Sequence, residues 1–136
     1  MEVDMRSADP AALQAVDATF HKAVDNAVAD ENARWNSRAL TVDKTLVGNR
    51  PAGQTPEKSG IVQAAISVTK ALNLPLSLDE GSTDSNIPMS MGIPAITIDG
   101  GGRGSGAHAL NEWFDSANSW QGTQRALLIA LALAQP

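Results

Sequence analysis

His108 is the residue of this sequence best suited to chemistry, and it is one of only two histidines. It follows a glycine-rich stretch, residues 100–106, which itself follows an apolar, β-branched segment at residues 93–98. Ligands of α/β sheets bind beyond the carboxyl ends of the strands, where glycine lets a substrate or metal approach the backbone. We therefore expect His108 to lie in a functional site. The other histidine, His21, falls off the apolar stripe of a predicted helix, and we expect it to face solvent or a partner.

Glu112 follows His108 at a spacing of four, so the two side chains would share one face if residues 107–113 were helical. A carboxylate in that position could orient the imidazole, as carboxylates do for metal-bound histidines. It could equally be a helix N-terminal carboxylate that interacts with the helix dipole. The acidic turn at residues 79–86 offers further carboxylates, although such turns commonly cap helices. One imidazole and scattered acids do not complete a metal site.

The glycine-rich stretch also has a weak nucleotide-binding pattern. Residues 104–109 satisfy G-x-G-x-x-A after a predicted strand. The loop is long, however, with no Gly-Lys-Ser/Thr and no clear acidic partner for a ribose in a following strand. A nucleophilic Ser105 is no better supported, because it does not stand in a G-x-S-x-G turn.

The composition narrows the classes of protein and partner. The chain has 136 residues, 43% of them hydrophobic and 18% charged, which suits a soluble globular protein. Its net charge is −5, the wrong sign for neutralising phosphates, so we expect no nucleic-acid partner. Without cysteine, any metal must be bound by His, Asp or Glu.

Neither a membrane span nor a secretory signal is indicated. The longest apolar run, residues 126–134, is about half of the roughly 18 residues that cross a bilayer. The N-terminal sequence MEVDMRS lacks the basic and apolar regions of a signal peptide. We expect no membrane partner and a cytoplasmic location.

Hydrophobic periodicity predicts a strand, a helix and a second strand in the first fifty residues. Residues 1–6 and 40–47 alternate as half-buried strands do, and Asp9-Pro10 is a helix start that leads into an apolar stripe ending near Arg34. Two glycines and a proline interrupt regular structure at residues 48–53, the best candidate for a crossing between domains. Two strands and one helix make a poor domain, so we expect this sheet to be completed by further chain or by a second copy.

The remainder predicts two longer helices around short strands. Helices are expected at residues 56–73 and 119–134, and a polar turn at residues 82–86 can cap a short helix that stops at Gly92. Residues 75–78 could form a strand, and residues 93–98 fit a strand covered on both faces. The order of the elements predicts an α/β protein.

Five sequence blocks together resemble the C-terminal part of a family of dinuclear zinc hydrolases. That family comprises peptidase T, acetylornithine deacetylase, succinyl-diaminopimelate desuccinylase and the glutamate carboxypeptidases, and the peptidase T-like members are the nearest in appearance. The order of the blocks matches over nearly the whole chain. They are EVDMRS at 2–7, GNRPAG at 48–53, GSTDSNIP at 81–88, GIPAITI at 92–98, and the glycine loop with HALNEW at 108–113.

The resemblance implies a zinc-exopeptidase-like α/β catalytic domain with an inserted β-α-β-β-α-β lid that commonly mediates dimerisation. Residues 1–50 would be the second half of this lid, and residues 51–136 the C-terminal segment of the catalytic domain. A homodimer through the lid region is therefore expected.

The resemblance also assigns site residues. His108 matches the family's final zinc ligand, and Glu112 matches a partner that supports this histidine from outside the metal's own ligands. Arg50 is placed like a lid arginine that binds a substrate carboxylate. The walls of the substrate pocket are matched by Ser82, Asp84, Gly101 and Gly102. Asp99 departs from the pattern, which more often has a small residue there.

The activity that the resemblance implies is hydrolysis of an amide bond in a small peptide or N-acyl amino acid by a metal-activated water. Two zinc ions are expected, with cobalt or manganese as possible substitutes. The family's remaining ligands and its catalytic glutamate lie upstream of the lid, in a region absent from this sequence, so we expect the chain alone to be inactive. The alternative is a non-catalytic, oligomeric carboxylate-binding protein derived from that family.

Overall fold

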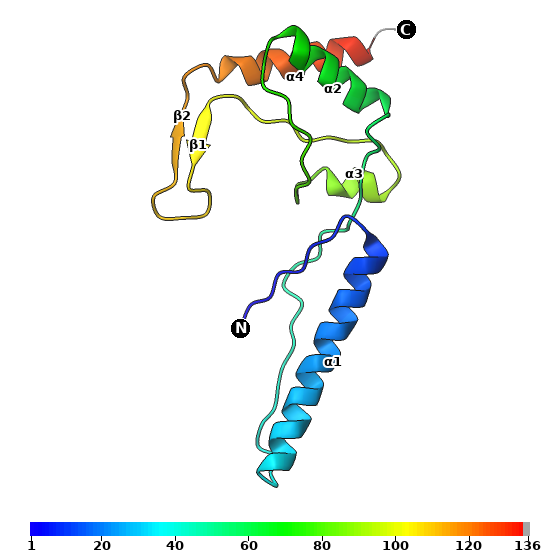
Figure 1. Ribbon diagram of the computed structural model, residues 1–136, viewed down its shortest axis with the longest axis vertical. Helices are drawn as coiled ribbons and strands as arrows, with labels where there is room; N and C mark the ends of the chain where they lie inside the picture. Colours follow the sequence, from blue (N-terminus) through cyan, green and yellow to red (C-terminus); the bar gives the residue numbers. More distant parts are fainter. Residues whose placement is uncertain (135–136) are drawn as a thin grey trace.

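The computed structural model describes residues 1–134, which form four helices and one small antiparallel sheet (Figure 1). The α/β prediction therefore holds only in the loose sense that both kinds of structure occur. None of the helices in the described range is long and apolar enough to cross a membrane. The elements are α1 (Pro10–Arg34), α2 (Gly60–Ala71), α3 (Asn86–Ser90), β1 (Arg103–Ser105), β2 (Trp113–Asp115) and α4 (Trp120–Leu133).

The long helix α1 begins where the sequence predicted. The Asp9 side chain accepts a hydrogen bond from the backbone N–H of Ala11 at 2.8 Å, and Pro10 occupies the first helical position. The segment after α1 runs back along the helix (Figure 1). Asn32 holds it by bonding both the carbonyl (2.8 Å) and the amide (3.1 Å) of Leu40. No residue of α1 is buried, and an ion pair between Lys44 and Asp25 joins the segment to the helix as well.

Four predicted strands are wrong, because residues 1–6, 40–47, 75–78 and 93–98 are without regular secondary structure. The prediction that residues 93–98 are covered on both faces is also wrong, since Ile93 is 52% exposed. A strand needs a neighbour to pair its backbone N–H and C=O groups, and alternation in the sequence does not supply one. Within residues 1–134 these four segments find no ladder partner.

Both longer helices predicted in the remainder are confirmed, with α2 beginning a few residues later than expected. They pack against each other, and the most buried side chains of the chain lie mainly on them. Val62 and Thr69 of α2 and Ile129 and Arg125 of α4 are each less than 9% exposed. This helix pair is the nearest approach to a core.

The short helix α3 and its stop are also confirmed. Gly92 has a φ of +75°, and its amide bonds to the carbonyl of Met89 at 3.0 Å. The amide of Ile93 bonds to the carbonyl of Pro88 at 2.9 Å. These paired bonds around a left-handed glycine form a Schellman motif, which ends the helix.

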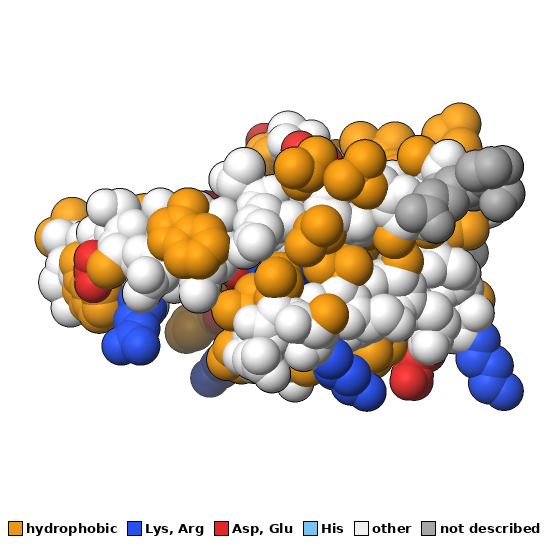
Figure 2. Space-filling view, turned by 90° about the horizontal axis from the view of Figure 1, so that it is seen from above, with side chains coloured by type: hydrophobic (Ala, Val, Ile, Leu, Met, Phe, Trp, Pro, Cys, Tyr) orange, Lys and Arg blue, Asp and Glu red, His pale blue; other side chains and the backbone are white. Residues whose placement is uncertain are grey.

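The described chain exposes more surface to solvent than a protein with a closed core would. The accessible surface is 10610 Å², whereas a folded monomer of 14.2 kDa would expose about 6,800 Å². No side chain of residues 1–134 is fully buried, and Trp120, Leu127 and Leu131 of α4 are each more than half exposed. Figure 2, which looks down on the upper end of Figure 1, shows hydrophobic side chains spread over this face. The described residues thus form small local clusters rather than one continuous core.

Candidate functional site

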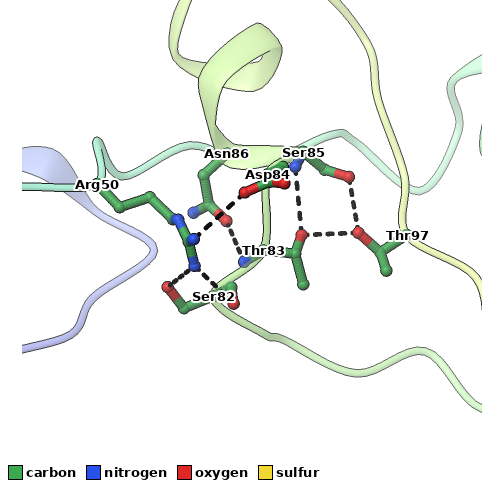
Figure 3. Close-up of polar contacts among 7 residues, drawn as sticks. All are labelled: Arg50, Ser82, Thr83, Asp84, Ser85, Asn86 and Thr97. Carbon is green, nitrogen blue, oxygen red and sulfur yellow. Dashed lines mark hydrogen bonds and ion pairs between the residues drawn. The ribbon is translucent and has the colours of Figure 1, made fainter.

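Arg50 and the turn before α3 form a polar cluster that joins two distant parts of the chain (Figure 3). The Nη1 of Arg50 donates to the carbonyl of Ser82 at 3.0 Å and to its Oγ at 3.2 Å. Its Nη2 donates to Oδ1 of Asp84 at 3.2 Å. The structure therefore brings together three of the residues that the sequence predicted to bind substrate.

The turn that carries Ser82 and Asp84 is itself held by side chains. The amide of Thr83 donates to Oδ1 of Asn86 at 2.9 Å, and the Oγ1 of Thr83 accepts from the amide of Ser85 at 3.3 Å. The hydroxyl of Thr97 lies 2.6 Å from that of Thr83 and 2.7 Å from that of Ser85 (Figure 3). Sequence reasoning missed Thr97, because it lies in another segment and no local pattern marks its contacts.

Two contacts place the crossing segment that carries Arg50. The hydroxyl of Thr55 donates to the carbonyl of Ala95 at 2.6 Å and accepts from its amide at 3.0 Å. Gly53 lies directly against α3, since a Cβ on it would come within 2.7 Å of the Cβ of Met89. The crossing is thus fixed to α3 and to the segment after it, and Arg50 reaches the turn before α3 from there.

The Asp84 carboxylate compensates the charge of Arg50 only in part. The Asp84 side chain is 93% exposed and that of Arg50 is 44% exposed, so water screens the ion pair. A guanidinium has five N–H groups, and the bonds to Ser82 and Asp84 within residues 1–134 use three of them. Nε–H and one N–H of Nη2 are left, and donors of this kind suit the two oxygens of a carboxylate.

His108 lies in the loop that joins β1 to β2, and Figure 1 shows this loop well apart from α3. The expectation that residues 107–113 are helical is wrong, because His108 has a φ of +65° in a turn. Its backbone amide, not its imidazole, faces Oε2 of Glu112 at 3.4 Å. The two residues are neighbours, but they do not share a helical face.

The described residues do not by themselves fit a metal ion. His108 and Glu112 are both exposed, and residues 1–134 contain no group of three or more His, Asp or Glu side chains placed to hold one. Three protein ligands are the usual number at a catalytic zinc ion. His108 as a zinc ligand therefore stays a prediction.

Gly101 and Gly102 are placed by close approach to other backbone rather than by contact with the Arg50 cluster. Both have positive φ. A Cβ on Gly101 would lie 2.6 Å from the carbonyl oxygen of Ser119, and one on Gly102 would lie 2.7 Å from that of Asp115. Only glycine meets both demands here. Their predicted place in the wall of a substrate pocket stays a prediction.

Asp99 and Arg125 fix this glycine stretch, and the sequence did not reveal the pair. Arg125 is 6% exposed, donates to the carbonyl of Asp99 at 2.8 Å and forms an ion pair with its carboxylate at 2.6 Å. The other carboxylate oxygen accepts from the amide of Gly101 at 2.9 Å. The hydrogen bond from Arg125 holds the pKa of the Asp99 carboxyl below its usual value, against the opposing effect of burial. Asp99, at which the sequence departs from the family that it resembles, thus orders the loop.

A cavity of about 490 Å³ lies beside the crossing segment. It contains none of the predicted site residues, so it does not extend the Arg50 cluster. Its walls are Ala8, Asp9, Pro10, Ala52, Gly53, Gln54, Met89 and Ser90.

No protein-family model matches this sequence, and no curated protein matches it either.

Proposed function

We propose that this chain contributes the carboxylate-binding part of a zinc-dependent hydrolase that cleaves amide bonds in small peptides or N-acyl amino acids. The observation that carries the proposal is the Arg50 guanidinium, held by Ser82 and Asp84 with two N–H groups left for a ligand. Both substrate classes end in a carboxylate, which a planar guanidinium recognises through two parallel hydrogen bonds. The resemblance of the five sequence blocks supports the assignment to this class of enzyme.

The second half of the proposal is a zinc site. His108 would be one ligand and Glu112 a supporting carboxylate, with two zinc ions, or cobalt or manganese, in the working site. Since residues 1–134 do not group enough ligands, the others would come from polypeptide outside this range.

A second candidate is a non-catalytic, oligomeric carboxylate-binding protein. One observation favours it. The Arg50 cluster is formed within this chain, whereas residues 1–134 do not group the candidate metal ligands. In both candidates the ligand is an organic carboxylate, and in both we propose a homodimer through residues 1–50.

Carboxylate binding is tested by titrating the full chain with N-acetylalanine and following the Nε–H signal of Arg50 by NMR. We expect this signal to shift with N-acetylalanine and to stay in place with N-acetylalanine amide, which lacks the charge. Arg50→Lys removes the fork while keeping the charge, and should weaken binding about tenfold or more. Equal binding of the acid and the amide would refute carboxylate recognition.

Zinc content and hydrolysis separate the two candidates. Wild type, His108→Ala and the control His21→Ala are each combined with the polypeptide proposed to supply the remaining ligands, loaded with zinc, and assayed with a tripeptide and N-acetylalanine. Zinc and turnover that are lost only in His108→Ala would support the hydrolase. Carboxylate binding without zinc or turnover in any of the three would support the binding protein.

A further inference from the structure

Thr97 joins the segment at residues 93–98 to the turn at residues 82–86. Among the side-chain hydrogen bonds of the described residues, its hydroxyl alone connects these two segments. It lies within 2.7 Å of two other hydroxyls, those of Thr83 and Ser85. A hydroxyl has one donor and two acceptor lone pairs, so Thr97 can donate to one neighbour and accept from the other. The three hydroxyls are thus linked by two hydrogen bonds without any charged group (Figure 3).

The turn that Thr97 fixes is the one that orients Arg50. Thr83 stands between Ser82 and Asp84, the two residues that accept hydrogen bonds from the guanidinium. If the turn rotated, the Ser82 carbonyl and the Asp84 carboxylate would move together, and the guanidinium would lose its fixed direction. A binding group that is already ordered loses less conformational entropy when a ligand arrives.

We propose that Thr97 is a positioning residue for the carboxylate site: its hydroxyl holds the turn at residues 82–86 so that Arg50 presents its free N–H groups in one direction. This inference rests on the proposed function of Arg50. Thr97 itself makes no hydrogen bond to Arg50 in the structure, so its effect on a ligand would pass through Thr83 and Ser85.

The test compares variants of the full chain in the titration with N-acetylalanine. Thr97→Val keeps the shape of the side chain and removes the hydroxyl. We expect the affinity for N-acetylalanine to fall about fivefold, which corresponds to the net free energy of about one hydrogen bond. Thr97→Ser keeps the hydroxyl and should restore binding. The control is Thr45→Val, the same chemical change at an exposed residue without a side-chain hydrogen bond in the described range. The Arg50 Nε–H signal should broaden or shift in Thr97→Val before any ligand is added.

Ser85→Ala provides a second route if Thr97→Val loses its helical circular dichroism. It removes another hydroxyl of the same trio, and the Ser85 side chain makes no capping bond to α3, so the helix should persist. An unchanged affinity in Thr97→Val or Ser85→Ala would overturn the inference, as would failure of Thr97→Ser to restore binding. The proposed function fails in a different way, since wild type itself would then not distinguish N-acetylalanine from its amide.

Discussion

Replacing Gly122 by alanine sets two effects of known size against each other. Gly122 lies in the first turn of α4, where alanine favours the helix by at most about 1 kcal/mol relative to glycine. A Cβ there, however, would overlap the carbonyl group of Gly100 and lie 2.5 Å from the amide nitrogen of Gly101. Ordinary contacts are about 3.5–4.0 Å, so the loop would have to retreat by about 1 Å or more.

The loop cannot retreat freely, because Asp99 joins the amide of Gly101 to Arg125. Overpacking usually costs about 1–3 kcal/mol. Because the Cβ would overlap backbone atoms, which cannot rotate aside, the upper part of this range applies, about 2–3 kcal/mol. After about 1 kcal/mol of helix gain is subtracted, we expect Gly122→Ala to lower the free energy of unfolding by about 1–2 kcal/mol.

The assay is urea unfolding of the full chain followed by circular dichroism. Gly60→Ala is the matched control, because Gly60 also lies at the start of a helix and no atom comes within 4 Å of a Cβ placed on it. We expect this control to be unchanged or stabilised by about 0.5 kcal/mol. If Gly122→Ala were as stable as wild type or more stable, the close contact between α4 and the glycine stretch would be refuted.

Three other perturbations test separate contacts. Because the pKa of the Asp99 carboxyl is lowered in the folded chain, its ionised form stabilises the fold at pH values above its ordinary pKa of 3.8. This contribution is lost as the pH falls through the lowered pKa. In acid unfolding curves, Asp99→Asn should therefore show a smaller loss of stability in this pH range than wild type. Thr55→Val removes both bonds to Ala95 and should destabilise the chain by about 1–2 kcal/mol in urea, while Thr55→Ser should lose less. If residues 1–50 form a homodimer, light scattering should give twice the chain mass for wild type. Val16→Asp places a charge on an exposed apolar position of α1 and should give the mass of a monomer. A dimer in both proteins would exclude this face of α1 as the interface.

Helices could be predicted from the sequence because their signals are local. The Asp9-Pro10 start, the apolar stripes and the Gly92 stop each act within one or two turns, and all three features occur in the structure. Strands depend on partners elsewhere in the chain, and alternation at residues 1–6 and 40–47 says nothing about whether a partner exists. The sheet found in the described part of the chain is a hairpin, in which the partner strand is a near neighbour in the sequence.

The candidate site divides in the same way. The sequence blocks pointed to Arg50 together with the turn at residues 82–86, and the structure joins them. Thr97 and Arg125 act through contacts 12 to 26 residues away, with side chains that look unremarkable in the sequence. The spacing of His108 and Glu112 led to a wrong prediction of a helix, because this part of the chain forms a turn after the glycine-rich stretch.

The double hydrogen bond of Thr55 with Ala95 also closes a ring of chain. It joins residues 40 positions apart, and α2 and α3 both lie inside the ring. For a flexible loop the entropic cost of closure rises only logarithmically, by about 0.6 kcal/mol for each doubling of length. The irregular segment between α2 and the turn, residues 75–81, is therefore a place where insertions and deletions should be tolerated, while the positions of Thr55 and Ala95 stay fixed.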